Sequence, residues 1–174
     1  MDISNGKGVG ISLFVQGCHF HCKNCFNSST WDFDGGKEWT EVKKNNFINL
    51  ARNPFIKRIS ILGGEPLADE NLKDVLDLVN EIRLSMPEKT IWLYSGYTWE
   101  ETKLMMKGID YESLEFNRLN NLRREIIKQC DVMVDGRYVD ELKDLSLSWR
   151  GSSNQRIINV QGSIRQEKMI LYSD

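Results

Sequence analysis

Short apolar runs alternate with longer amphipathic segments along this chain. The runs are rich in Ile, Val and Leu and end at glycine or at small polar residues, which is typical of buried strands. The sequence predicts strands at residues 9–16, 57–62, 90–94 and 131–134. Two closing strands are expected at 157–160 and 169–171, and a hairpin around Gly162 and Ser163 is one way to join them.

The segments between these strands have the apolar spacing of helices, at residues 40–53, at 69–85 and at about 118–129. A short helix is also expected after Thr98, because Glu101 stands where the second half of a capping box belongs.

In the first predicted helix, Thr40 is the expected N-terminal cap. The spacing predicts Lys43 and Lys44 on its outward face, with Phe47 and Leu50 turned inward.

Strand–helix alternation of this kind predicts a mostly parallel α/β sheet. A complete (β/α)8 barrel usually needs about 250 residues, so 174 residues favour an open, partial (β/α) barrel. No repeat or linker divides the chain, and we expect a single domain over residues 1–174. Ligands in such folds bind at the carboxyl ends of the strands.

The composition describes a globular protein, with 40% hydrophobic and 28% charged residues. A net charge of −2 argues against a general nucleic-acid or membrane binder. No apolar run approaches the length of a membrane span, and residues 1–7 lack the pattern of a signal peptide. We therefore expect a cytoplasmic protein that binds neither nucleic acid nor membrane.

Three of the four cysteines, Cys18, Cys22 and Cys25, form a C-x3-C-x2-C loop after the first predicted strand. Clustering favours a metal or cofactor site over a disulfide framework. Four thiolates usually hold an iron–sulfur cluster, so three would leave one iron open. The alternative is a structural zinc site with His19 or His21 as the fourth ligand. Each histidine adjoins a cysteine, which makes joint ligation awkward and favours the cluster.

Small or acidic residues follow the later strands. Gly63 and Gly64 allow close backbone approach, and Glu65 can accept a hydrogen bond from a cationic amine. The competing interpretation is a tight turn before Pro66. Ser95-Gly96 and Asp135 end the next strands and are further candidates, with ordinary loops as the alternative. The fourth cysteine, Cys130, is expected to be a buried, inert thiol.

Taken together, these motifs resemble the radical S-adenosylmethionine (SAM) superfamily, and within it the activating components of anaerobic (class III) ribonucleotide reductase. The resemblance covers most of the chain, at residues 10–18, 25–27, 62–67, 94–98, 131–136 and 150–156. One departure concerns the residue before the third cysteine, which is Asn24 rather than an aromatic, while Phe26 follows that cysteine. The backbone from Asn24 to Phe26 is therefore the candidate adenine contact.

The resemblance implies an oxidoreductase with a [4Fe-4S] cluster on the three cysteines and SAM chelated to the open iron. The implied SAM-binding residues are Asn24, Cys25, Phe26, Gly63, Gly64, Glu65, Ser95, Gly96 and Asp135. A flavodoxin-type protein would supply the electron that splits SAM. The resulting 5′-deoxyadenosyl radical would take hydrogen from a glycine of the anaerobic reductase. Further contacts to SAM or to the partner are implied for Arg150, Asn154 and Arg156.

Three alternatives remain. The first is an activase of another glycyl-radical enzyme, of the formate-lyase type, and the 150–156 segment discriminates against it. A small-molecule radical-SAM enzyme such as the deazapurine-forming synthase would need purine- and metal-binding features that we do not find. A non-enzymatic zinc or iron–sulfur binding module would leave the Gly63-Gly64-Glu65 turn without a purpose.

Overall fold

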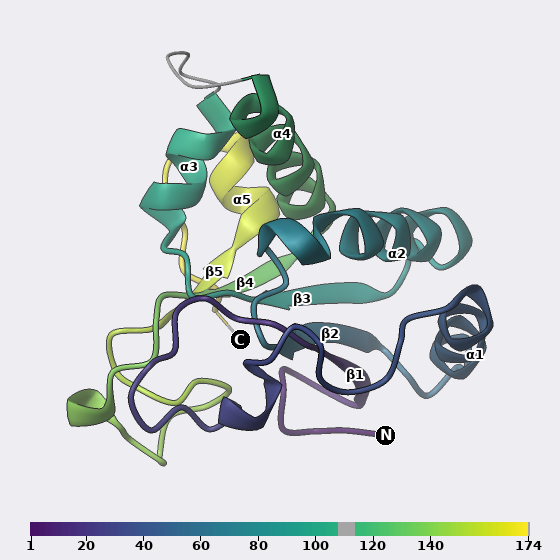
Figure 1. Ribbon diagram of the computed structural model, residues 1–174, viewed down its shortest axis with the longest axis horizontal. Coiled ribbons are helices and arrows are strands. Elements are labelled where there is room, and N and C mark those ends of the chain that lie inside the picture. The colour runs from purple at the N-terminus through teal and green to yellow at the C-terminus, as the bar shows by residue number, and fades with distance from the viewer. Residues whose placement is uncertain (108–113, 174) are drawn as a thin grey trace.

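The computed structural model describes residues 1–107 and 114–173, which form an α/β structure around one open sheet (Figure 1). Its strands follow chain order across the sheet, and the first four are parallel. The fifth is antiparallel to the fourth and pairs Arg156 with Asp135. The strands are β1 (Gly10–Val15), β2 (Arg58–Gly63), β3 (Thr90–Tyr94), β4 (Val132–Asp135) and β5 (Arg156–Asn159).

Helices cover one face of this sheet (Figure 1). They are α1 (Glu41–Ala51), α2 (Leu72–Ser85), α3 (Trp99–Lys107), α4 (Leu114–Gln129) and α5 (Val160–Arg165). Short 3-10 turns occur at Ser28–Thr30, Asp69–Asn71 and Asp140–Leu142. Within the described ranges, no helix combines the length and the apolar character needed to cross a membrane.

The alternation of side chains along each strand divides the apolar residues between the two faces. On β3, Ile91 and Leu93 point into the main core beneath the helices. Trp92 points to the opposite face and packs with residues of β4, β5 and the C-terminal segment. None of the helices in the described ranges covers this second face, and several of its side chains line a cavity.

The N-terminal segment, residues 2–5, packs on the helix-free face of the sheet at β2. Arg58 is completely buried there, and its guanidinium donates to the carbonyl oxygens of Asn5 and Asp2 and to the Asp2 carboxylate. Ser60 also donates to the Asn5 carbonyl, at 2.6 Å. Since a buried charge needs such partners, residues 2–5 are an integral part of the fold.

The expectation of an open, mostly parallel sheet is confirmed, and the first four strands match their predicted positions to within two residues. The predicted caps are also present. The Thr40 side chain accepts from Lys43 N, and Thr98 and Glu101 exchange the two bonds of a capping box.

The predicted orientation of α1 is wrong at two positions. Lys44 is buried with its ammonium 2.6 Å from Asp77 on α2, while Leu50 is 65% exposed. A distant carboxylate therefore draws the lysine inward, and local spacing along the helix carries no sign of that partner.

The predicted closing hairpin is also wrong, because α5 follows β5 directly. The Asn159 side chain caps this helix by accepting from Gly162 N at 2.8 Å, and Ser163 Oγ donates to the Asn159 carbonyl at 2.6 Å. These local bonds favour a helix at residues expected to form a turn. The predicted last strand is reduced to an isolated bridge between Leu171 and Ile158.

Candidate functional site

The cysteine loop begins where β1 ends, and its base is fixed by main-chain hydrogen bonds. Gly17 N donates to Thr30 O at 2.9 Å, and Cys18 N donates to Trp31 O at 3.0 Å. Gly17 has a φ of +91°, and a Cβ at this position would lie 2.0 Å from the Phe33 ring. The loop therefore closes on itself around a residue that must be glycine.

The turn after β2 packs directly on the base of this loop. Gly64 N donates to Val15 O at 2.9 Å, and Glu65 N donates to Gly17 O at 2.7 Å. A Cβ on Gly64 would lie 2.3 Å from Gly17 O. The glycine pair is thus required for contact between the two predicted motifs, in addition to any approach to a ligand.

The Glu65 carboxylate links this turn to the end of β3. It accepts hydrogen bonds from Ser95 Oγ at 2.8 Å, Gly96 N at 2.7 Å and Leu67 N at 2.9 Å. Burial raises the pKa of Glu65 to about 7 and outweighs these hydrogen bonds, which act in the opposite direction. A cationic group placed next to this carboxyl would favour its ionised form.

A cavity of about 520 Å³ brings most of the candidate residues together. It opens at the carboxyl ends of β1 to β4, where the sequence places its motifs. The predicted site residues that line it are Cys18, Cys22, Cys25, Phe26, Gly63, Gly64, Glu65, Ser95, Gly96 and Arg150.

Four predicted residues have side chains engaged elsewhere. Asn24 donates to Asp140 at 2.6 Å, and Asn154 donates to Arg137 O at 2.8 Å. The other two form an ion pair, in which Arg156 Nη2 lies 2.5 Å from the Asp135 carboxylate.

Further contacts hold the Asp135–Arg156 pair at the end of the sheet. Asp135 is fully buried and also accepts from Trp99 N at 2.7 Å, and Arg156 reaches Glu100 at 2.6 Å. Asp135, Asn154 and Arg156 line a neighbouring pocket of about 390 Å³ rather than the cysteine cavity. Contacts from these residues to SAM or to a partner stay predictions.

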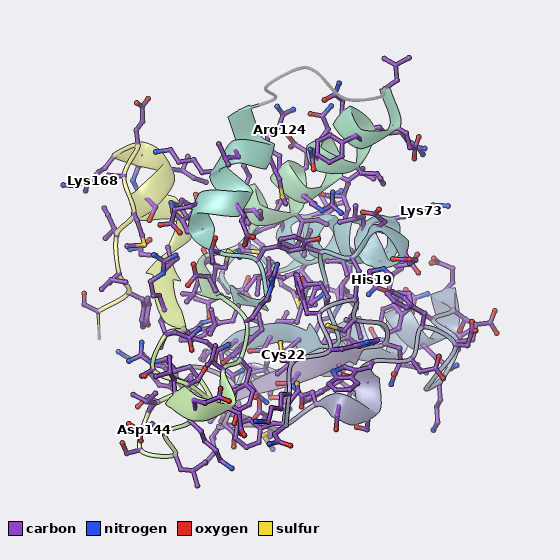
Figure 2. All side chains as sticks on the ribbon, turned by 60° about the vertical axis from the view of Figure 1, so that its left-hand side comes forward. His19, Cys22, Lys73, Arg124, Asp144 and Lys168 are labelled. Atoms are coloured by element: carbon purple, nitrogen blue, oxygen red, sulfur yellow. The ribbon has the colours of Figure 1, made fainter. Side chains whose placement is uncertain are left out.

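The three cysteines of the loop are free thiols that differ in exposure. Cys18 is buried, while Cys22 and Cys25 are partly exposed. Figure 2 shows Cys22 and His19 well away from Arg124 and Lys168 on the helical side. Burial raises the pKa of the Cys18 and Cys22 thiols, so a bound cation is needed to stabilise their thiolates at neutral pH.

The donor set fits an iron–sulfur cluster better than a single zinc ion. His19 Nε2 lies 3.1 Å from the Glu70 carboxylate, and the His21 ring packs against Trp31 with ring centres 4.8 Å apart. Among the described His, Cys, Asp and Glu residues, no three are grouped as a single-metal site requires. A four-iron cluster takes thiolate ligands, and all three cysteines of the loop line the cavity.

A second segment of the chain, residues 136–151, forms the opposite wall of the cavity and bonds to the cysteine loop. The Arg137 guanidinium lies 4.4 Å from the centre of the Phe20 ring, and Lys23 pairs with Glu141 at 3.4 Å. The Phe26 and Tyr138 rings are 5.2 Å apart. The loop is therefore held from both sides, by β2 and by this segment.

Several residues that line the cavity were not predicted as site residues. Phe14 and Tyr94 are each two positions beyond a residue on the helix-free face of its strand, so period-two spacing could have indicated them. Trp149 and Tyr138 come from the irregular 136–151 segment, which carries no such local signal. The prediction that Cys130 is buried is confirmed. Its thiol donates to Ile126 O, and burial raises its pKa to about 12.

Comparison with known proteins identifies the family. The model of a 4Fe-4S single cluster domain matches residues 4–158. The anaerobic ribonucleoside-triphosphate reductase-activating protein of Escherichia coli (strain K12) is 40% identical over 163 residues, 92% of this chain and 95% of that protein. The protein of the same name from Vibrio cholerae is 36% identical over 159 residues, 90% of this chain and 92% of the relative. Its counterpart in Enterobacteria phage T4 is 33% identical over 156 residues, 90% and 87% of the two chains. No solved structure gives a significant match. The chain therefore belongs to the 4Fe-4S single cluster domain family and, within it, to the anaerobic ribonucleoside-triphosphate reductase-activating proteins.

Proposed function

We propose that this chain is a radical-SAM activase that generates a glycyl radical on the catalytic subunit of anaerobic ribonucleotide reductase. In this proposal it is one domain with an open, partial (β/α) barrel, and it works in the cytoplasm with a flavodoxin-type reductant. Cys18, Cys22 and Cys25 hold a [4Fe-4S] cluster with one open iron, on which SAM binds. When bound, the reduced cluster supplies the electron that cleaves SAM into methionine and a 5′-deoxyadenosyl radical.

One observation carries the proposal. The three cysteines share a single cavity with Gly63-Gly64-Glu65 and Ser95-Gly96, although these motifs lie far apart in the sequence. A site that only held a cluster would need no buried carboxyl beside it. A site for SAM does, because the methionyl ammonium of SAM is a cation that Glu65 can receive.

The chain's own residues bind and orient the ligands in this proposal. The thiolates hold three of the four irons, and the turn after β2 places Glu65 against the base of the cysteine loop. Ser95 Oγ and Gly96 N fix the orientation of that carboxyl through bonds of 2.8 and 2.7 Å. The aromatic side chains of Phe26, Tyr138 and Trp149 exclude water from the cavity wall.

The choice of partner rests on the names of the relatives, which cover about nine-tenths of this chain. The proposed radical reaction is also consistent with the two histidines of the chain. Both histidines are engaged with neighbouring side chains, and abstraction of a hydrogen atom requires no general base.

The test is anaerobic reconstitution with iron and sulfide, followed by reduction in the presence of SAM and detection of 5′-deoxyadenosine. The anaerobic reductase is then added, and its glycyl radical is followed by electron paramagnetic resonance. Cys22→Ser should lose SAM cleavage, whereas the matched Cys130→Ser variant should keep it.

A protein that binds one zinc ion and leaves SAM intact would overturn the proposal in favour of a structural metal site. Cleavage of SAM with a radical formed on a formate-lyase type enzyme, but none on the reductase, would keep the chemistry and change the partner.

A further inference from the structure

The two edge strands of the sheet, β5 and β1, differ in how many of their outer main-chain groups are hydrogen-bonded. Along β5, the outer edge is covered by the C-terminal segment through main-chain bonds. Asn159 N donates to Ile170 O at 2.9 Å, and Tyr172 N donates to Ile157 O at 2.8 Å. This cover protects the edge from pairing with other chains.

Among the described residues, main-chain hydrogen bonds cover the outer edge of β1 only at its start. Gly10 and Asp2 exchange main-chain bonds of 2.7 and 2.8 Å. Beyond Gly10, the outward-facing residues are Ser12 and Phe14, because the alternate residues Val9 and Val15 bond toward β2. Within the part of the chain that the structure describes, no main-chain partner meets the N–H and C=O groups of Ser12 and Phe14 on this edge.

The uncovered stretch leads into the cavity that holds the cysteines. Phe14 is 47% exposed, although it belongs to a strand, and it lines that cavity on one side. It also lines a second hollow of about 510 Å³, whose wall includes apolar residues such as Leu13, Val15 and Trp39 and several charged side chains. The partly exposed Phe14 therefore lines both the cysteine cavity and the hollow beside the edge of β1.

We propose that this edge binds an extended segment of the protein whose radical the chain generates, as an added strand beside β1. The inference rests on the proposed function and names the surface that presents the substrate. Free N–H and C=O groups repeat here at the spacing of a strand, and an extended polypeptide is the ligand that matches them. The segment pairs with Ser12 and Phe14, and its following residues enter the cavity past the Phe14 ring.

Two features favour a protein segment over a small molecule. The hollow beside the edge has a mixed lining, with apolar Leu13 and Val15 and charged Lys37 and Asp74, which suits the varied side chains of a polypeptide. In addition, β1 is the terminal strand of the described sheet, and Phe14 near its end lines the cavity, so an added strand would lead toward the cysteines.

The test compares Ser12→Pro with Ser12→Ala in the cluster-loaded full-length chain. Both variants lose the Ser12 hydroxyl bond to Asp2, but only proline removes the outward-facing N–H. Proline is tolerated on an edge strand where its missing donor faces outward. We expect the proline variant to bind full-length anaerobic reductase about fivefold more weakly than the alanine variant. Both should form 5′-deoxyadenosine from SAM equally well without reductase.

A second measurement avoids any question of how the proline variant folds. In the wild-type chain, hydrogen exchange at the amides of Ser12 and Phe14 should slow when the reductase is added. Equal affinities of the two variants, or unchanged exchange at both amides in the complex, would overturn the inference. So would protection that already appears in the isolated chain as its concentration rises, because a second copy would then occupy the edge.

These outcomes separate the inference from the proposed function. Reductase binding and amide protection are measured without SAM, so a chain that binds through this edge but never cleaves SAM would refute only the proposed chemistry. A chain that cleaves SAM and activates the reductase with the edge unprotected would refute only the docking surface.

Discussion

Gly64→Ala tests whether contact between the β2 turn and the cysteine loop holds the cluster site in place. The added methyl group would lie 2.3 Å from Gly17 O and 2.9 Å from Thr30 O. Both obstacles are backbone atoms, so rotation of a side chain cannot relieve them. An ordinary contact requires the two segments to separate by about 1 Å.

The separation displaces Gly17, the residue before the first cysteine of the loop. It lengthens the 2.7 Å bond from Glu65 N to Gly17 O and displaces Cys18 relative to the other thiols. Overpacking of this kind costs about 3 kcal/mol, which for a chain of this size lowers the melting temperature by about 9 °C. We also expect the iron and sulfide bound per chain after reconstitution to fall markedly.

Gly8→Ala is the matched control. Gly8 has a φ of +76°, so alanine there is strained, but its Cβ would meet no atom within 4 Å. The control should lose about 1 kcal/mol of stability and keep a full cluster. Iron and sulfide are measured per chain, alongside thermal unfolding by circular dichroism. A Gly64→Ala protein that binds as much iron as Gly8→Ala, at a similar melting temperature, would refute the reasoning.

Three further predictions concern individual side chains. Cys22→Ser should lose most of the reconstituted iron while Cys130→Ser keeps it, as measured by metal analysis, and iron loss in the Cys130 variant would contradict the inert role of that thiol. Asp135→Asn weakens a buried pair with Arg156 and should lower stability by about 2 kcal/mol in thermal unfolding; a changed Kd for SAM at unchanged stability would instead indicate a cofactor contact. The raised pKa of Glu65, about 7, means that binding a cationic amine requires ionisation of this carboxyl, so affinity for SAM should fall up to about tenfold for each pH unit below 7 and level off above it. Affinity independent of pH between 5.5 and 8 would argue that Glu65 does not receive the amine.

Much of the sheet follows from local sequence. The strands β2 and β3 are short apolar runs ended by Gly63 or by Ser95-Gly96, and burial on both faces leaves few other conformations for them. The errors arise where a distant contact or a short-range cap decides. Lys44 is buried by Asp77, which is distant in sequence, and α5 depends on the Asn159 cap at residues that resemble a turn.

The candidate site was predictable where its residues follow strands, because the carboxyl ends of parallel strands meet at one edge of a sheet. That rule anticipates the meeting of Cys18, Glu65 and Ser95 in one cavity. The rule does not predict Tyr138 or Trp149, because they lie in the irregular 136–151 segment, whose path depends on tertiary contacts. Nor does it show that the Asp135 side chain turns to Arg156 instead of the cysteine cavity.

The antiparallel direction of β5 affects how the binding specificity of the cavity can differ between relatives. A parallel fifth strand would need a crossover that runs back across the sheet, usually as a helix. The antiparallel β5 starts at the end of the sheet where β4 finishes, so the connection between them needs no crossover, and many of its residues line the cavity. Exchanging residues 136–155 between relatives should therefore alter what the site accepts while the register of the sheet stays intact.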